Sequence, residues 1–334
     1  MPAKLSTMTA YDIIGDVHGC ADKLLGLLGQ MGYREHAGAF RCPGRQAIFV
    51  GDLIDRGRYQ SQTVNIVRAM VEAGTARAIM GNHEFNAISY VTSNPLVPGD
   101  FMRTHTGRQG EKNYDQHQRF LESVGPGSTL HREYIAWFRT LPLWLDLDGL
   151  RVVHACWHTA SIAVLDPLFR GPSPVSEQFI IDANTTGTPA HQAVEVVTKG
   201  PDVDLGAGFI YLDKGGHPRK SARIRWWLTD ATSLRELAEV PPRSTAPSGG
   251  MFPELPDRPC PDAARFRYQD DVPVFFGHYW RTGIPKPVSE HAACVDYSAV
   301  HNGRLVAYRW DGEQRPTAAQ YCGFPDFQPV RASL

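Results

Sequence analysis

The sequence lacks paired cysteines, long apolar runs and a clear excess of either charge. Its six cysteines are scattered without a CxxC pair, so we expect free thiols in a reducing compartment rather than a disulfide framework. The longest apolar runs, such as 272–276, fall far short of the roughly 20 residues that cross a bilayer. Residues 1–10 contain no apolar core typical of a secretion signal. These absences predict a cytoplasmic protein with no membrane partner.

The balance of charge also limits the classes of partner. The 334 residues carry a formal net charge of -1 at pH 7. Sequence-independent binding to nucleic acid depends on clustered Lys and Arg, so we do not expect a nucleic-acid partner and rank a nuclease low. The hydrophobic content of 42% is enough for a sizeable core. The chain is therefore long enough for one large α/β domain or two ordinary ones.

A repeated pattern predicts alternating strands and helices. Short apolar runs end in clusters of Gly, Asp, Asn or His, and the first two lead into segments with apolar residues at helical spacing, 24–31 and 64–71. The runs are 11–14, 47–50, 77–80, 150–153 and 272–276, and the polar residues after them are Asp16 and His18, Asp52, Asn82 and His83, His154, and His278. Open α/β sheets place ligands outside the carboxyl ends of their strands. We therefore expect these side chains to meet.

The meeting residues have the chemistry of a site for two metal ions. Divalent metals that activate water are bound by carboxylate and imidazole groups, and a pair of ions needs one shared ligand. Asp16 and His18 are close enough in sequence to reach one ion, and Asp52 is able to bridge. Asn82, His154 and His278 are able to complete the coordination shell of the second ion. The absence of cysteine from this set argues against a closed structural zinc site.

Two stretches interrupt the pattern, and a third ends it. The first, 86–146, is polar and rich in histidine, with helices expected at 116–124 and 132–141 and with His105, His117 and His131 on the surface. The second, 166–266, is the least regular part, and we expect much of it to be loop. At the end of the chain, 292–296 and 304–309 alternate like antiparallel strands around a turn at 302–303.

Five motifs in order identify a family resemblance. GDVHG at 15–19, GDLIDRG at 51–57, GNHE at 81–84, a strand ending in His154, and Gly277-His278 resemble the calcineurin-like metallophosphoesterases, in particular the phosphoprotein phosphatase branch and its bacterial relatives. The resemblance implies an α/β fold: a β-sandwich flanked by helices, with inserted cap segments. We thus expect a single domain over 1–334 with insertions at about 86–146 and 166–266.

The resemblance also implies a role for each residue. Asp16, His18 and Asp52 would bind the first metal, and Asp52, Asn82, His154 and His278 the second. The cofactors would be two divalent ions, with Mn²⁺ as first choice and Fe or Zn as alternatives. A hydroxide between the metals would attack phosphorus in line. His83 would protonate the leaving oxygen, Asp55 would orient His83, and Arg56 would grip phosphate together with Asn82.

The sequence departs from the family pattern near the metals. Bulky residues follow two of the ligands, Cys156-Trp157 after His154 and Tyr279-Trp280 after His278, where relatives have smaller ones. The family's additional phosphate-binding arginine has no certain counterpart. Arg223 and Arg225 are candidates because strand periodicity would place both on one face, although solvated arginines on an amphipathic strand are the commoner explanation of such a pair.

Several functions remain open at this stage. The first is a phosphomonoesterase of the serine/threonine protein phosphatase type, with a phosphorylated protein as partner. The second is a hydrolase of dinucleoside polyphosphates such as diadenosine tetraphosphate, with a nucleotide as substrate. The third is an inactive phosphate-binding scaffold, which would lack ligands or the proton donor. The sequence leaves the oligomeric state open.

Overall fold

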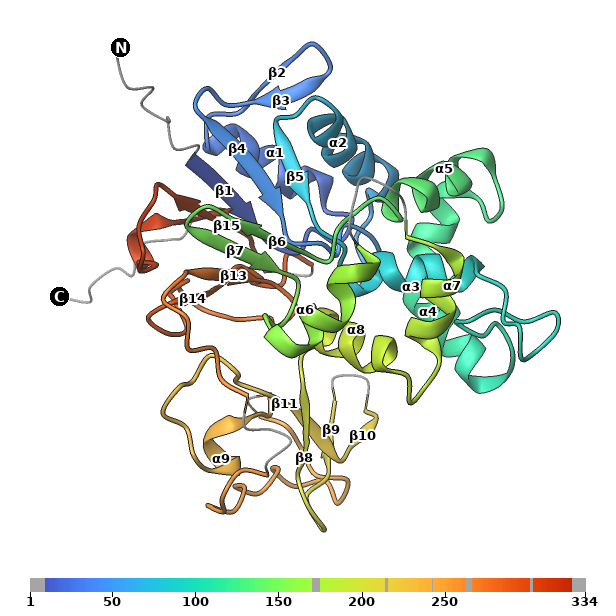
Figure 1. The fold of residues 1–334 in the computed structure, drawn as a ribbon, viewed down its shortest axis with the longest axis vertical. Coiled ribbons are helices and arrows are strands. Elements are labelled where there is room, and N and C mark those ends of the chain that lie inside the picture. The colour runs from blue at the N-terminus through green and yellow to red at the C-terminus, as the bar shows by residue number, and fades with distance from the viewer. Residues whose placement is uncertain are drawn as a thin grey trace.

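Two β-sheets packed face to face form the centre of the protein (Figure 1). The computed structural model describes residues 10–169, 175–213, 216–241, 243–261, 266–300 and 303–325. The first sheet has the order β16-β15-β1-β4-β5 and the second the order β14-β13-β7-β6. Their strands are β1 (Ala10–Ile14), β4 (Arg45–Phe49), β5 (Ala76–Ala78), β6 (Trp144–Leu147), β7 (Leu150–Val153), β13 (Val274–Phe276), β14 (Ala292–Cys294), β15 (Leu305–Trp310) and β16 (Tyr321–Phe324).

The core between the sheets follows from the alternation of side chains along each strand. Ile13 and Ile48 point to one side and pack with Val152 and Phe275 of the second sheet. Their sequence neighbours, such as Ile14, belong to a second core that includes the helices. Successive residues of a strand face opposite sides of a sheet, so one short apolar run supplies both cores. The predicted sandwich flanked by helices is confirmed.

Helices cover the outer faces of the sandwich. The apolar stripes predicted for the first two helices are buried in α1 (Ala21–Gln30) and α2 (Gln60–Glu72), which contact the first sheet. In Figure 1, α6 (Thr159–Leu165) and α8 (Pro189–Lys199) lie beside the second sheet. A small hairpin, β2 (Arg34–His36) and β3 (Ala39–Arg41), projects at one end, and two short 3₁₀ turns lie at Asp166–Leu168 and Ala318–Gln320.

Three helices follow the third motif: α3 (Asn82–Val91), α4 (Gly107–Val124) and α5 (Thr129–Phe138). Helix α4 begins at Gly107, well before the predicted 116, because its buried face starts with Gly110 and Asn113 and therefore gives no apolar signal. Helix α5 begins earlier than predicted because Ser128 caps it by accepting a hydrogen bond from the backbone of His131.

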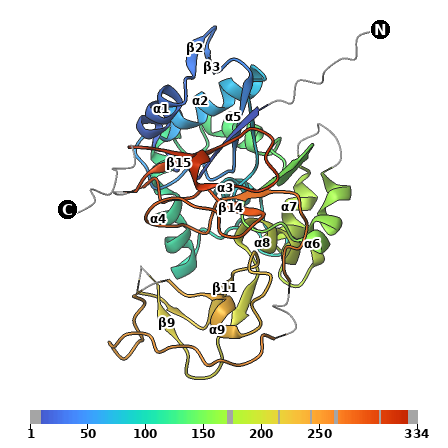
Figure 2. The same cartoon turned by 90° about the vertical axis from the view of Figure 1, so that its left-hand side faces the viewer.

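The second interrupting stretch is more regular at its start than expected. Helices α7 (Glu177–Asn184) and α8 are each capped by a hydroxyl side chain, Ser176 and Thr188, and Pro189 opens α8. The expectation of loop is therefore wrong over these helices. Beyond them, the described residues of this stretch form short elements, at the bottom of Figures 1 and 2: β8 (Asp202–Asp204), β9 (Tyr211–Leu212), β10 (Pro218–Arg219), β11 (Ser221–Ile224), α9 (Leu234–Leu237) and β12 (Ala238–Glu239).

The last two predicted strands do not pair with each other. Strand β14 runs parallel to β13 in the second sheet, whereas β15 runs antiparallel to β1 in the first. Alternation along a strand reports which residues are buried and not which strand is the neighbour, so the predicted hairpin is wrong. Asn302 of the predicted turn, like residues 1–9, lies outside the described residues.

The sequence predicts free thiols and no membrane-spanning segment. All six cysteines are free thiols. Across the described residues, none of the helices is both long and apolar enough to span a bilayer.

A buried carboxylate in the middle of β1 ties the first sheet to its surroundings. Asp12 is fully buried and accepts hydrogen bonds from Tyr33 (2.9 Å), Arg45 (2.9 Å) and Arg309 (3.1 Å). We predict that Asp12→Ala lowers the free energy of unfolding by about 3–5 kcal/mol, because the largely buried guanidinium of Arg45 loses its buried carboxylate partner. Urea-induced unfolding measures this loss.

The matched control uses the other carboxylate on the same arginine. Asp311 also pairs with Arg45, but its side chain is 53% exposed. Asp311→Ala should therefore cost less than about 1 kcal/mol. Equal losses in the two variants would show that burial of Asp12 contributes nothing.

Candidate metal centre

Five strand ends meet at one edge of the sandwich. Strands β1 and β4 are parallel neighbours in register, so Asp16 and Asp52 follow adjacent ends. Strand β5 lies next to β4, and Asn82 opens the helix after it. In the second sheet β7 and β13 are also parallel and in register, which places His154 beside His278. The predicted convergence therefore comes from two facing sheets.

Glycines allow the strand ends to approach this closely. A Cβ atom on Gly277 would lie 2.0 Å from Oδ1 of Asp16, and one on Gly51 would lie 2.4 Å from the backbone nitrogen of Gly81. Real Cβ atoms do not tolerate such distances. The close packing at Gly51 and Gly277 therefore leaves no room for a side chain.

The backbone of the site is held in a rarely populated conformation. Among the described residues, eight other than glycine have a positive φ, and only Ala37 lies away from the site. The others are His18, Asp52, Asp55, Arg56, Arg243, His278 and Ser298, with φ between 47° and 68°. Such residues cost of order 1–3 kcal/mol each and cluster at functional sites. The concentration of strain marks this edge as the functional part of the fold.

Asp52 belongs to two groups of side chains whose atoms are placed so that they could hold a metal ion. Its Oδ2 atom is 3.6 Å from Nε2 of His18 and 3.8 Å from Nε2 of His83, while its Oδ1 atom is 3.3 Å from Nε2 of His154. His278 joins His154 and Asp52 in the second group. Within each group the ligand atoms lie within 4.8 Å of one another. One carboxylate thus faces both groups, as a bridging ligand must.

Asp16 and Asn82 complete the set. Asp16 accepts a hydrogen bond from the backbone of His278 through Oδ2 (3.1 Å), but its buried Oδ1 has no partner among the residues that the structure describes. Asn82 Oδ1 lies 3.1 Å from Nε2 of His154. A buried carboxylate oxygen without a donor is costly unless a cation satisfies it. The donor set of carboxylate, amide and imidazole therefore fits divalent metal ions.

Backbone carbonyls fix the orientation of two histidines. Nδ1 of His18 bonds to the carbonyl of Ile54 (2.8 Å), and Nδ1 of His154 bonds to the carbonyl of Val50 (2.7 Å). Both rings therefore carry the Nδ1 proton and turn Nε2 toward Asp52. Metal-bound histidines in proteins are oriented by partners of this kind.

Burial and neighbouring charges shift the pKa values of the residues in the cluster. Burial lowers the pKa of His18 to about 3. For His154, burial also lowers the pKa, but the carboxylate of Asp52 outweighs it and raises the pKa to about 10. Burial, reinforced by Asp296, raises the pKa of Asp16 well above its ordinary value. Protons on His154 and Asp16 are therefore what a bound cation would displace.

Glu84, the last residue of GNHE, connects two of the motif turns. Its carboxylate accepts hydrogen bonds from the backbone nitrogens of Asp52 (2.8 Å), Leu53 (2.7 Å) and Gly81 (2.9 Å). The side chain is fully buried. It does not belong to either group of metal-binding side chains. Its contacts instead fix the position of Asp52 relative to the start of α3.

Asp55 accepts hydrogen bonds from two histidines, one through each carboxylate oxygen. Nδ1 of His83 lies 2.5 Å from its Oδ2, and Nδ1 of His117 lies 2.8 Å from its Oδ1. Burial raises the pKa of Asp55, but these hydrogen bonds outweigh it and hold the pKa well below the ordinary range. The expectation that His117 and His131 lie on the surface is wrong, because each is 3% exposed; His105 is exposed as expected.

A pocket of about 830 Å³ opens onto the cluster. Six predicted site residues line it: Asp16, His18, Asp52, Arg56, Asn82 and His278. Arg223 also lines it, whereas its partner candidate Arg225 pairs with Glu239. Tyr279 and Trp280 belong to the wall. Cys156 and Trp157 are buried and are not among the lining residues.

Sequence reasoning missed three residues of this region. Asp296 is buried against the cluster and lines the pocket; it follows β14, so the strand-end signal used for the other ligands would have found it. Arg243 lines the pocket from the second interrupting stretch, where no local signal marks it. His117 has no signal in its own helix, because its partner Asp55 lies 62 residues away in sequence.

Comparisons with known proteins agree with the motifs. The asymmetrical bis(5′-nucleosyl)-tetraphosphatase of Halalkalibacterium halodurans is 46% identical over 74 residues, covering 22% of this chain and 30% of the relative, so the match spans less than a third of that protein. The symmetrical bis(5′-nucleosyl)-tetraphosphatase of Vibrio cholerae is 24% identical over 90% of this chain and 94% of its own. A serine/threonine phosphatase of Saccharomyces cerevisiae superposes with a TM-score of 0.48 and 14% identity, over 98% of this chain and 83% of that one.

The family model described as calcineurin-like phosphoesterase matches residues 11–182. This segment contains GDVHG, GDLIDRG, GNHE and His154. It covers 172 of the 334 residues, which is more than half of the chain. The chain belongs to the calcineurin-like phosphoesterase family.

Proposed function

We propose that this metallophosphoesterase hydrolyses a phosphoanhydride bond of dinucleoside polyphosphates. The observation that carries the proposal is the arrangement of arginines around the pocket. Arg56 of GDLIDRG lines the pocket, and Arg223 and Arg243 line it from the second interrupting stretch. A phosphomonoester offers one phosphate, which Arg56 and the metals would satisfy. Two additional arginines in the same pocket suit a chain of several phosphates.

Arg243 is available for such a role. Its backbone has a φ of 64°, and within the described part of the chain its guanidinium makes no ion pair or hydrogen bond. Arg223, in contrast, pairs with Asp202 (3.0 Å) and bonds to the carbonyl of Gly200 (2.9 Å). Tyr211 and Trp280 line the same pocket and provide rings on which a base can stack. The names of the relatives, both tetraphosphatases, point the same way.

We also propose a role for each residue of the cluster. Asp16, His18 and Asp52 hold one divalent ion, and Asp52, Asn82, His154 and His278 hold the other, with manganese as first choice. When bound, the two ions supply an activated water and neutralise charge on phosphate oxygens. Arg56 and Asn82 hold the phosphate. Because the pocket is lined by residues of the core and of the second interrupting stretch, we treat the whole chain as one domain with two insertions.

His83 delivers a proton in this proposal. Its Nδ1 is held by Asp55, so Nε2 faces the cluster 3.8 Å from Asp52. A proton on Nε2 passes to the oxygen of the leaving group as its bond to phosphorus breaks. Asp55 keeps the ring in this orientation and stabilises its charged form. Burial lowers the pKa of His83, but the carboxylates of Asp52 and Asp55 outweigh it, so the pKa is raised.

The second candidate is a serine/threonine protein phosphatase. GDLIDRG and GNHE resemble the phosphoprotein phosphatase branch, and that observation favours a phosphomonoester. The same cluster and the same proton donor serve both reactions. Arg223 and Arg243 distinguish the two reactions, because a phosphorylated side chain does not require a second phosphate site.

The substrate proposal predicts a difference in substrate preference. The manganese-loaded protein should hydrolyse diadenosine tetraphosphate with a higher kcat/KM than a phosphoserine peptide. Arg243→Ala should raise KM for the dinucleotide about tenfold, the cost of one charge-assisted hydrogen bond, and leave KM for p-nitrophenyl phosphate unchanged.

Arg219→Ala is the matched control, because Arg219 pairs with Asp213 and does not line the pocket. Turnover of the peptide alone would identify the protein phosphatase instead. A metal-loaded protein that turns over neither substrate would support the inactive scaffold.

The bridging role of Asp52 predicts the metal content of a variant. Asp52→Asn removes the charge that both ions share and should weaken both by at least about tenfold. Elemental analysis after dialysis measures this without reference to activity. Asp55→Asn is the control and should keep both ions, because Asp55 contacts His83 and His117 rather than the ligands. Full occupancy in Asp52→Asn would contradict the assignment.

The role of His83 predicts a dependence on the leaving group. His83→Asn should retain both metals and lower kcat by about 10²- to 10⁴-fold for an alkyl phosphate, whose leaving oxygen needs a proton. The loss should be small for 2,4-dinitrophenyl phosphate, whose leaving group departs as a stable anion. Unchanged activity on the alkyl phosphate would remove His83 from the reaction.

A further inference from the structure

His117 reaches the catalytic region from an inserted helix. It lies in α4, whereas Asp55 follows β4 and His83 is in the first turn of α3. Its Nδ1 is 2.8 Å from Oδ1 of Asp55, and both side chains are 3% exposed. Because Asp55 accepts, Nδ1 of His117 carries the proton. A helix outside the core of the sandwich therefore donates directly to the carboxylate behind the proton donor.

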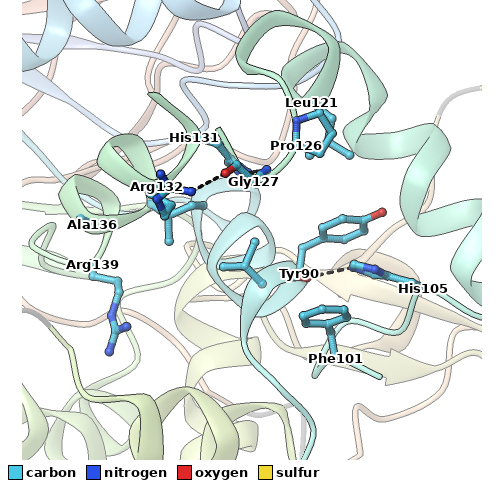
Figure 3. A pocket seen from close by; sticks show the side chains of 12 residues that line it. Tyr90, Phe101, His105, Leu121, Pro126, Gly127, His131, Arg132, Ala136 and Arg139 are labelled. Carbon is cyan, nitrogen blue, oxygen red and sulfur yellow. Dashed lines mark hydrogen bonds between the residues drawn. The ribbon is translucent and has the colours of Figure 1, made fainter. Parts of the chain in front are cut away.

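Apart from Nδ1, the His117 ring makes no polar contact with the described residues. Its Nε2 is buried and has no hydrogen-bond partner among them. The ring packs against Tyr90 and Phe120, at centroid distances of 5.3 Å and 5.0 Å. Tyr90 belongs to the wall of a separate pocket between α3, α4 and α5, where it lies beside His105 and Phe101 (Figure 3). Within the described part of the chain, Asp55 is thus the single polar contact of the His117 ring.

The geometry points to a positioning role. We infer that His117 is a positioning residue that fixes the plane of the Asp55 carboxylate, so that Oδ2 stays aligned with Nδ1 of His83. This inference rests on the proposed role of His83 and adds a third member, supplied by the first insertion, to the pair of His83 and Asp55.

The physical reason lies in the side chain of Asp55. The last torsion of an aspartate is soft, so a carboxylate bonded through one oxygen can rotate and draw its partner with it. A second donor on the other oxygen removes that freedom. His117 is suited to this because its buried ring packs against both Tyr90 and Phe120. The gain is precision in the direction of Nε2 of His83.

The test separates positioning from simple packing. His117→Phe keeps a ring and removes the donor, and we expect kcat on an alkyl phosphate to fall about 10- to 100-fold, with KM unchanged. On 2,4-dinitrophenyl phosphate the loss should be small. His117→Asn places an amide nitrogen near the position of Nδ1 and should recover most of kcat. A packing defect would lower kcat for both esters and would not be rescued by Asn.

The matched control is His131→Phe. His131 is equally buried and contacts Phe120 from α5, but it makes no bond to Asp55. It should leave kcat on both esters unchanged. Equal losses on the two esters in His117→Phe, or failure of Asn to rescue, would overturn the inference.

A measurement on the unaltered protein keeps the inference testable if His117→Phe does not fold. In the zinc-loaded protein with ¹⁵N-labelled histidine, NMR should find a proton on Nδ1 of both His83 and His117. An Nδ1 of His117 that carries no proton would overturn the inference. The two proposals fail separately: His83→Asn with full activity on the alkyl phosphate removes the proton donor itself, whereas a normal His83 result with an inert His117→Phe removes only the positioning residue.

Discussion

The site depends on backbone that the fold holds in a conformation most residues avoid. Left-handed backbone at His18, Asp52 and His278 turns each side chain back toward the same point. Such strain persists only where surrounding structure over-determines it. Here the sandwich supplies that structure, because the strands leading into these turns are buried on both faces. The packing of the core therefore determines the geometry of the site.

The electrostatic arrangement follows from the same convergence. Five strand ends bring several carboxylates and histidines into a volume with little water, which would be unfavourable without compensation. Asp52 relieves part of the cost by facing His18 with one oxygen and His154 with the other. The unpartnered oxygen of Asp16 is the part that remains. The charge and the donor atoms of the site are thus complementary to divalent cations.

Much of this could be predicted from the sequence, and the exceptions share a cause. Strand ends with Gly and Asp report local structure, so the meeting of Asp16, Asp52 and His154 followed from the motifs, whereas the sandwich followed from the family resemblance. The partner of β15 and the burial of His117 depend on contacts between distant segments, which periodicity does not encode. Helix α4 began earlier than expected because its buried face uses polar residues. Arg243 had no signal at all, because its place at the pocket is set by the tertiary structure of a loop.

Glu84 has a consequence for engineering of this family. By accepting three backbone hydrogen bonds, it makes the turn after β4 and the start of α3 a single rigid piece. The separation between Asp52 and His83 is then fixed by main-chain geometry, and no rotamer can adjust it. A graft that carries GDLIDRG into another scaffold without its own GNHE would import the ligand and lose the spacing, so the two motifs are best transplanted as a pair.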